Sequence, residues 1–226
     1  MGRPALLAVD CGRVPYEEAL AWQHRLVAAR GRGDVPDVLL TLEHDPVYTA
    51  GRRANVAANV LGTTGIRVVP VERGGDVTYH GPGQLVAYPI VALQHAKAVR
   101  GYVEALEEAC VRTAAAFGVG ARAEPPPRTG VWVGDTKLAA VGIKLDGRVT
   151  SHGLAFNVDP DLDHFAGIVP CGIAGAGVCS LASLGVRADL GEVRAVLVAT
   201  LADTLARDAV PAKLADVGLA PSVASP

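Results

Sequence analysis

The sequence predicts an α/β fold, a single domain with mixed β-sheets and flanking helices. Three segments repeat their apolar residues with helical spacing, and eight short runs rich in β-branched residues lie before and between them. Because strands outnumber helices, we do not expect strict strand–helix alternation. The chain has 226 residues, 50% of them hydrophobic and 19% charged, which suits one sizeable core and excludes a disordered chain.

Two of the three predicted helices carry start or stop signals. Pro15 opens the first, and Glu17 and Glu18 lie in its first turn, where carboxylates interact favourably with the helix dipole. The second stops at Gly118, a residue type that commonly ends helices. The third rests on apolar spacing alone. The helices are therefore predicted over 15–31, 100–117 and 190–208.

The predicted strands are short, and turn residues separate most of them. The 26 glycines and 15 prolines are more than a helical bundle uses and indicate many loops. The segment 1–209 is interpreted as one domain, whereas 210–226, rich in alanine, proline and serine, is expected to be a loosely ordered tail. The strands are predicted over 5–9, 37–43, 67–71, 76–79, 84–90, 130–134, 137–145 and 148–158.

The last two predicted strands form a hairpin. Asp146-Gly147 is a pair preferred in two-residue type I′ turns, so Leu145 is predicted to pair with Arg148, and Lys137 with Phe156. A bulge at one of the hairpin's glycines would change this count. Alternation puts Lys137 on one apolar face with Ala139, Val141, Ile143, Leu154 and Phe156.

Lys137 in such a strand needs a specific explanation. Only four of the 21 basic residues are lysines, so arginine supplies most of the ordinary surface charge. A buried lysine is costly unless it is paired or used. An ammonium beside a thiol favours the thiolate, which is the nucleophilic form. The residue to pair with it is Cys171, which follows Pro170 and precedes Gly172 in a tight-turn sequence.

The other cysteines favour a structural interpretation. Cys110 falls in a helical apolar stripe, Cys11 has no activating context, and nothing around Cys179 indicates activation. There is no CxxC motif, so neither a metal site nor a cofactor is expected. The net charge of −2 gives no general attraction for nucleic acid or membrane, and no apolar run reaches the length of a membrane span. We expect a cytoplasmic protein with free thiols.

The segment 72–90, ERGGDVTYHGPGQLVAYPI, is the most distinctive of the chain. It can be a glycine-rich loop that wraps a substrate, with Arg73 and His80 lining it, or a simple Gly-Pro-Gly turn between two strands. It matches neither a Walker A loop nor GxGxxG, so it does not support nucleotide binding. His152 lies in a similar glycine-bearing strand.

Five motifs in order closely resemble one family. They are HDPVYTAGRR, RGGDVTYHGPGQLVAYPI, GVWVGDTKLAAVGIKL, SHGLAFNVD, and GIVPCGI followed by SLASLG. The family is that of the lipoyl(octanoyl) transferases of lipoate biosynthesis, often called LipB, and the resemblance runs from about Leu39 to Leu184. It implies a fold similar to the catalytic domains of lipoate ligases and biotin protein ligases.

The resemblance also implies an activity. It is the transfer of an octanoyl group from acyl carrier protein to a lysine of lipoyl domains, those of 2-oxoacid dehydrogenase E2 subunits and of glycine cleavage H protein. The family's acyl-accepting cysteine falls on Cys171 and its partner lysine on Lys137. Its substrate-binding stretches fall on Arg73, Gly74, Gly75, Asp76, Val77, Thr78, Tyr79, His80, Ala140, Val141, Gly142, Gly153, Leu154 and Ala155.

Three alternatives remain at this point. An ATP-dependent lipoate or biotin ligase on the same fold would need a nucleotide site and no cysteine nucleophile. A non-catalytic module that binds lipoyl domains would use Cys171 only for packing. A plain cysteine hydrolase is not supported by any Cys-His-Asn pattern. Acidic carrier proteins would also need a local basic patch, for which Arg52, Arg53 and Arg73 are the candidates.

Overall fold

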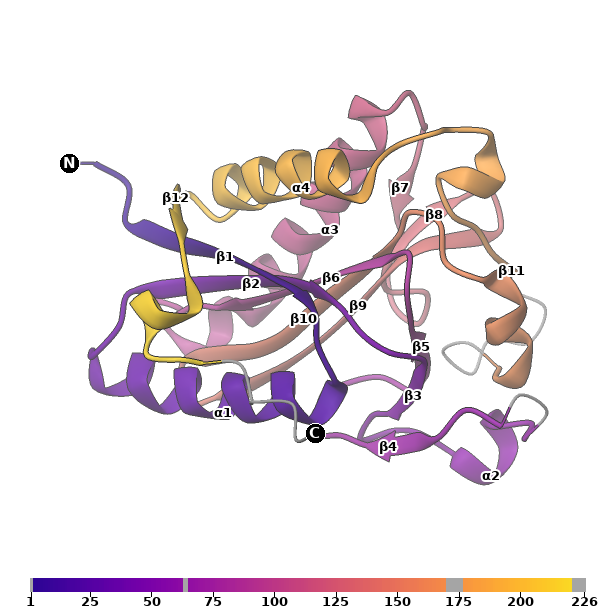
Figure 1. Cartoon of the computed structure of the whole chain (residues 1–226), viewed down its shortest axis with the longest axis horizontal. Coiled ribbons are helices and arrows are strands. Elements are labelled where there is room, and N and C mark those ends of the chain that lie inside the picture. Colours follow the sequence, from indigo (N-terminus) through magenta and orange to yellow (C-terminus); the bar gives the residue numbers. More distant parts are fainter. Residues whose placement is uncertain (1, 63–64, 170–176, 221–226) are drawn as a thin grey trace.

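A large mixed sheet and a small second sheet organise the protein. The computed structural model describes residues 2–62, 65–169 and 177–220. The large sheet has the strand order β12-β1-β2-β6-β10-β9-β8-β7, and β11 pairs with β9 at its side. The small sheet has the order β4-β3-β5. The predicted α/β class with mixed sheets is confirmed (Figure 1).

The strands of the large sheet include all the long strands. The bounds are β1 Ala5–Arg13, β2 Asp37–Glu43, β6 Gln84–Ile90, β7 Arg122–Ala123, β8 Val131–Val133, β9 Thr136–Asp146, β10 Val149–Asn157, β11 Gly177–Val178 and β12 Asp208–Ala212. The small sheet consists of β3 Val47–Ala50, β4 Val68–Pro70 and β5 Val77–His80. The sequence did not predict β3, β7, β11 or β12, which are short or lack alternation.

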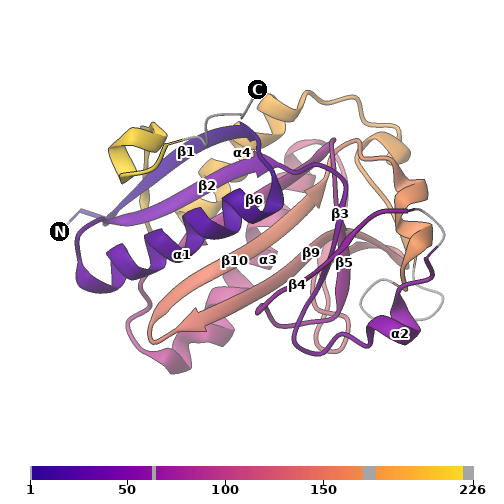
Figure 2. The same cartoon turned by 60° about the horizontal axis from the view of Figure 1, so that its bottom comes forward.

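Helices cover the two faces of the large sheet (Figures 1 and 2). Helix α1, Tyr16–Arg32, packs through Trp22 and Leu26 on one face. Helices α3, Val99–Ala116, and α4, Leu190–Thr204, pack on the other face, where the larger core cluster lies. The short α2 spans Val56–Asn59. In the described part of the chain, no helix is both long and apolar enough to cross a membrane.

The helix ends follow the predicted signals. Pro15 is the residue before α1, and Gly33 closes that helix in the left-handed conformation with φ +84°. Gly118, with φ +76°, follows α3 and donates its N–H to Ala115 O. Helix α4 begins with a capping box between Asp189 and Glu192, which the sequence analysis did not use, and it ends four residues earlier than predicted.

The β9–β10 hairpin differs from its predicted register. Asp146 pairs with Val149, so Gly147 and Arg148 form the turn, and Phe156 pairs with Ala139 rather than with Lys137. Gly147 has φ +59°, whereas Arg148 is not among the described residues with positive φ. A single glycine at the first central position fits a type II′ turn, not the predicted type I′ turn.

The predicted face survives this correction. Each partner moves by two positions, and residues two apart lie on the same face of a strand. The five apolar residues named for that face belong to one core cluster with α3 and α4 (Ala139, Val141, Ile143, Leu154 and Phe156). The register runs without a bulge from Phe156 to Val149.

The C-terminal region contains ordered elements as far as it is described. Strand β12 begins two residues before the segment that the sequence predicts to be a loosely ordered tail, and it continues into that segment. It pairs in parallel with β1. Val217 and Leu219 are buried against the α1 side of the sheet. Their isolated apolar side chains give no periodic signal, which is why the sequence did not show this docking. The position of the domain boundary stays a prediction.

Candidate active site

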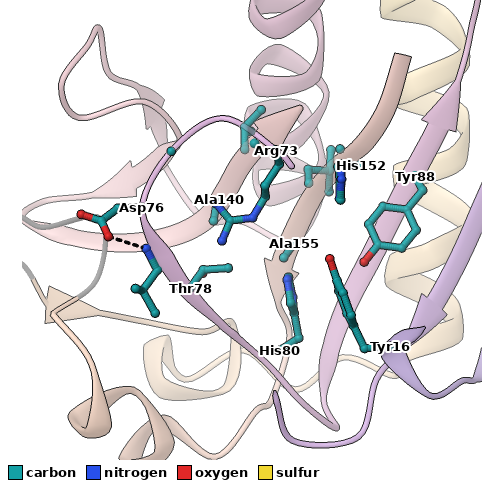
Figure 3. Close-up of a pocket in the computed structure, with 15 residues that line it drawn as sticks. Tyr16, Arg73, Asp76, Thr78, His80, Tyr88, Ala140, His152 and Ala155 are labelled. Carbon is teal, nitrogen blue, oxygen red and sulfur yellow. Dashed lines mark hydrogen bonds between the residues drawn. The ribbon is translucent and has the colours of Figure 1, made fainter. Parts of the chain in front are cut away.

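A cleft lies between the small sheet and the β9–β10 hairpin (Figure 3). It encloses about 490 Å³, counting its open mouth. Most of the residues that the sequence assigned to substrate binding lie around it. Its lining consists of Tyr16, Arg73, Gly75, Asp76, Val77, Thr78, His80, Tyr88, Ala140, Val141, Gly142, His152, Gly153, Leu154 and Ala155.

Small residues of the hairpin form the floor of the cleft. Ala140 pairs with Ala155 and Gly142 with Gly153, so each strand has two alternate positions on one face with little or no side chain. A Cβ at Gly153 would lie 2.2 Å from Ala87 O, and one at Gly142 would lie 3.1 Å from Arg73 Cδ. The sheet therefore tolerates no larger residue at Gly153, and a narrow apolar channel remains above the floor.

Arg73 forms one wall and is buried, with 7% of its surface exposed. Its Nη2 donates to Thr49 O at 2.7 Å and to Thr49 Oγ1 at 2.9 Å, and Nη1 donates to Gly74 O. These bonds fix the glycine loop after Arg73 against β3. Arg73 was expected to contribute to a surface patch for an acidic partner, and this is wrong because its guanidinium points inward.

Two predicted residues do not line the cleft. Strand β5 alternates, so Thr78 and His80 point into the cleft while Tyr79 points to the opposite side. There the Tyr79 hydroxyl lies 2.8 Å from His164 Nδ1. Gly74 donates its N–H to Ile143 O and borders the neighbouring groove described below.

Asp76 stabilises the loop that leads into β5. Its Oδ1 accepts from Val77 N at 2.7 Å, and its Oδ2 accepts from Asn59 Nδ2 at 2.6 Å. The loop is also held by backbone bonds from Arg52 N to Arg73 O and from Arg53 N to Gly75 O. The motif around Arg52 and Arg53 and the motif around Arg73 are thus adjacent in space.

Tyr16 and Tyr88 also line the cleft, although the sequence did not indicate either as a site residue. Tyr16 is the first residue of α1 and Tyr88 lies in the middle of β6, and both are nearly buried. Aromatic residues at such positions are typical of a core, so no local signal separates them from packing residues. Burial raises the pKa of Tyr16 to about 12 and raises the pKa of Tyr88 well above its usual value.

Three buried histidines surround the same end of the cleft. Burial lowers the pKa of His44 to about 4 and the pKa of His152 to about 3, and lowers the pKa of His80 well below its usual value. All three are therefore neutral near pH 7. His44 lies behind Tyr88, with its Nε2 2.8 Å from the Tyr88 hydroxyl.

Lys137 is buried beneath the loop that joins β7 and β8. Its Nζ donates to Thr129 O at 3.1 Å and lies 4.6 Å from the centre of the Trp132 ring, a favourable cation–π distance. Gly130 donates its N–H to Glu107 Oε1 at 2.7 Å, and a Cβ on Gly130 would lie 3.6 Å from Lys137 Nζ. Burial raises the pKa of Glu107. Neither the cleft nor the groove has Lys137 in its lining.

Cys171 lies outside the described residues. Strand β11 follows it in the chain, and Val178 of β11 pairs directly with Lys137. Burial raises the pKa of Cys179 and of Cys110, and raises the pKa of Cys11 to about 12. None of these three thiols is favoured as a thiolate, which agrees with their structural interpretation.

A larger groove runs beside the cleft, between α3 and β9. It has about 2200 Å³ of space, including its open side, and it meets the cleft at Gly75 and Gly142. Glu107 and Thr129, the neighbours of Lys137, also border it. Arg53 and Arg100 also border the groove, and Arg100 pairs with Glu104 at 2.9 Å.

The sequence is similar to one family of proteins over most of its length. Residues 15–202 match the family described as the lipoyl protein ligase A/B catalytic domain. An octanoyltransferase of Solibacter usitatus is 49% identical over 188 residues, covering 80% of this chain and 84% of the relative. An octanoyltransferase of Geobacter metallireducens is 48% identical over 187 residues, covering 82% of this chain and 86% of the relative.

Solved structures show the same fold at low identity. A lipoate-protein ligase A bound with ATP superposes with a TM-score of 0.76 at 20% identity, over 94% of this chain and 88% of the other. A biotin protein ligase from Aquifex aeolicus gives a TM-score of 0.51 at 12% identity, over 91% and 69% of the two chains. The predicted similarity to the folds of both ligases is confirmed.

Proposed function

The chain belongs to the lipoyl protein ligase A/B catalytic domain family, and we propose that within this family it is an octanoyltransferase that modifies lipoyl domains. The observation that carries this is the identity of 48–49% to two octanoyltransferases over at least 80% of the chain. The solved ligase structures are 12–20% identical to the chain, so their similarity shows the fold alone and does not support ATP-dependent chemistry here. The narrow apolar floor of the cleft suits a medium-length alkyl chain.

We further propose octanoyl-acyl carrier protein as the donor. The acceptors would be lysines in the lipoyl domains of 2-oxoacid dehydrogenase E2 subunits and of glycine cleavage H protein. Arg52 and Arg53 are exposed beside the glycine loop, at a place where an acidic carrier could dock. A nucleophilic thiol needs a reducing compartment, so we place the reaction in the cytoplasm.

The proposed reaction has two transfers. The Cys171 thiolate attacks the thioester carbonyl of the donor, a C–S bond to Cys171 forms and the C–S bond to the carrier breaks, and the departing carrier thiolate takes a proton from the Lys137 ammonium. The acceptor amine then attacks the thioester on Cys171, so that an amide C–N bond forms and the amine's proton goes to the departing thiol. The alkyl chain lies in the cleft during both transfers. No cofactor enters this scheme.

Lys137 is the proposed partner of Cys171. Its ammonium favours the thiolate and carries three N–H donors, one of which goes to Thr129 O. Val178 of β11, seven residues after Cys171 in the sequence, pairs with Lys137, which supports the proposed partnership. The carbonyl of Thr129 and the Trp132 ring would hold the ammonium in place between the two transfers.

Intact-mass spectrometry without ATP tests this function. The wild-type protein and Cys179→Ser, incubated with octanoyl carrier protein, should gain the mass of one octanoyl group and pass it to a lipoyl domain. Cys171→Ser should show neither the adduct nor the transfer, because a serine hydroxyl is far harder to ionise. An absolute requirement for ATP would favour a ligase, and an adduct that persists in Cys171→Ser would move the nucleophile elsewhere.

A further inference from the structure

Four polar side chains close the far end of the cleft, and we call them the polar end wall. They are Tyr16, His80, Tyr88 and His152, which come from α1, β5, β6 and β10. Figure 3 shows the hydroxyls of Tyr16 and Tyr88 and a nitrogen of His80 directed toward the same region. The Tyr16 and His80 rings stack at 6.0 Å, and the Tyr88 and His152 rings meet edge to face at 6.4 Å.

His80 presents a hydrogen-bond acceptor to this region. Asn157 Nδ2 donates to Cys179 O, and Gln84 Nε2 donates to Asn157 Oδ1 and to Tyr79 O. Gln84 Oε1 must therefore be the atom that accepts from His80 Nδ1, at 2.7 Å. With Nδ1 carrying the proton of a neutral ring, Nε2 is left with a lone pair. That lone pair has no partner within the described part of the protein.

Tyr88 presents a second acceptor. His44 Nδ1 lies 2.8 Å from Val14 O, which can only accept, so Nδ1 carries the proton. His44 Nε2 is then the acceptor for the Tyr88 hydroxyl. Because that proton is committed to His44, only the lone pairs of Tyr88 Oη are available to the cleft.

Tyr16 supplies the donor. Its side chain is 2% exposed, and no hydrogen bond of its hydroxyl is found among the described residues. His80 and Tyr88 thus offer two acceptors and Tyr16 offers one hydroxyl that can donate, while the neutral ring of His152 has one nitrogen of each kind. A carboxylate has no proton for the acceptors, whereas a hydroxyl group can both donate and accept.

His152 has a strained backbone conformation, which indicates that surrounding contacts hold this part of the wall in place. His152 has φ +56°, a conformation that residues with a Cβ rarely adopt. The buried Gln23 of α1 accepts its N–H at 2.7 Å and fixes this turn of the strand. Such local strain is common at ligand sites, where surrounding contacts maintain it.

We propose that the polar end wall binds a terminal hydroxyl, so that the cleft accepts ω-hydroxyacyl chains in addition to methyl-ended octanoyl chains. This inference rests on the proposed function of the cleft. A methyl group pressed against the wall leaves its polar atoms unpaired, and each such loss lowers affinity roughly ten-fold or more. A hydroxyl of nearly the same size restores those hydrogen bonds.

Pairs of donors with equal chain length test the proposal. One pair is nonanoyl and ω-hydroxyoctanoyl carrier protein, and the next is decanoyl and ω-hydroxynonanoyl carrier protein. In the pair whose last atom reaches the wall, we expect kcat/KM for the hydroxyl chain to be about ten-fold higher than for the methyl chain. Equal or lower values for the hydroxyl chains in both pairs would overturn the proposal.

Two variants test whether the polar end wall causes the preference for hydroxyl-ended chains. Tyr16→Phe should reduce the hydroxyl-to-methyl ratio several-fold, and Tyr102→Phe should not change it. Tyr102 is the matched control because it is similarly buried. Its hydroxyl donates to Pro89 O, and its ring lies in the core cluster that packs against α3 and α4. A ratio that is identical in wild type and in a folded Tyr16→Phe would assign the preference to another part of the protein.

A binding measurement separates this proposal from the proposed function. Calorimetry of Cys171→Ser with the two acyl-pantetheine thioesters of each pair reports the preference without turnover. If octanoyl transfer fails but the hydroxyl chain binds more tightly, the function is wrong and the wall stands. If transfer succeeds and binding shows no preference, the wall is wrong and the function stands.

Discussion

Asp37 and Lys137 are both buried charges on strands of the large sheet, and their surroundings differ. Asp37 Oδ1 lies 2.6 Å from Arg30 Nε and Oδ2 lies 2.7 Å from Arg207 Nε. Ala92 N also donates to Oδ1. Lys137 donates to the carbonyl of Thr129, faces the ring of Trp132 and interacts electrostatically with Glu107. A carboxylate shared by two arginines ties three segments of the fold together, whereas carbonyl and ring contacts hold the Lys137 ammonium in position.

The largest expected effect is on activity, at Lys137. Lys137→Met should lower kcat 10²- to 10⁴-fold, the usual range for losing a residue that moves protons, and should slow alkylation of Cys171 at neutral pH. Lys137→Arg should not restore turnover, because arginine does not release its proton in this range.

Lys144→Met is the control for that measurement. Lys144 lies on the same strand and pairs with the exposed Glu72. Its replacement should leave both kcat and the alkylation rate within a few-fold of wild type. An alkylation rate of Cys171 that is the same in wild type and in Lys137→Met would end the proposed pairing of the two residues.

The next effect is on stability, at Asp37. Asp37→Ala leaves two arginines without their shared carboxylate and should lower the free energy of unfolding by about 3 kcal/mol. Asp203 offers a matched control, since it also bridges two arginines, Arg3 and Arg112, but is 46% exposed. Asp203→Ala should cost under about 1 kcal/mol. Urea unfolding measures both, and equal losses would remove the distinction between buried and exposed pairing.

The buried histidines add a third case to this comparison, because their burial disfavours the charged form of the side chain. Burial lowers the pKa of His44 from 6.5 to about 4, so the unfolded chain binds more protons than the folded one between these values. The stability that His44 contributes is therefore complete above pH 6.5 and lost as pH falls toward 4, by roughly 3 kcal/mol.

Urea unfolding across this pH range measures the loss. His44→Gln should flatten the slope of stability against pH, and replacing the exposed His95 by glutamine should not. A His44→Gln slope that is as steep as that of the wild type would assign the acid sensitivity to other groups.

The smallest effect concerns charges in full contact with solvent. Arg52→Glu or Arg53→Glu should raise the KM for the carrier several-fold and weaken its dependence on salt, with kcat unchanged. Steady-state kinetics at two ionic strengths checks this. Unchanged KM in both variants would remove the patch from the proposed docking surface.

Much of the cleft could be predicted from the sequence because glycines and alternation are local signals. The loop after Arg73 and the small residues at Ala140 and Gly153 mark the floor and one wall of the cleft. The end wall could not be predicted in full. Tyr88 reaches the cleft only because β6 lies beside β10, and Tyr16 only because α1 starts next to His80. Such neighbours arise from tertiary packing, which periodicity does not describe.

The fold shows the same division between local and distant causes. Helix starts and most strands follow from local patterns, whereas the register of the hairpin depended on whether Asp146 or Gly147 took the first turn position. Only glycine adopts positive φ freely, and the structure places Gly147 there. The burial of Arg73 likewise depends on Thr49 of β3, a strand that the sequence did not predict.

The pairing of β12 with β1 decides which strand forms one border of the large sheet. Without β12, the backbone of β1 from Ala5 to Val9 would be an open edge, able to recruit a strand from another molecule. Strand β12 is a poorer template for such recruitment. It is short, Pro211 removes one N–H, and Asp208 adds a charge. Strand β12 thus covers an edge that would otherwise be open, and we expect its removal to cause aggregation before any loss of chemistry.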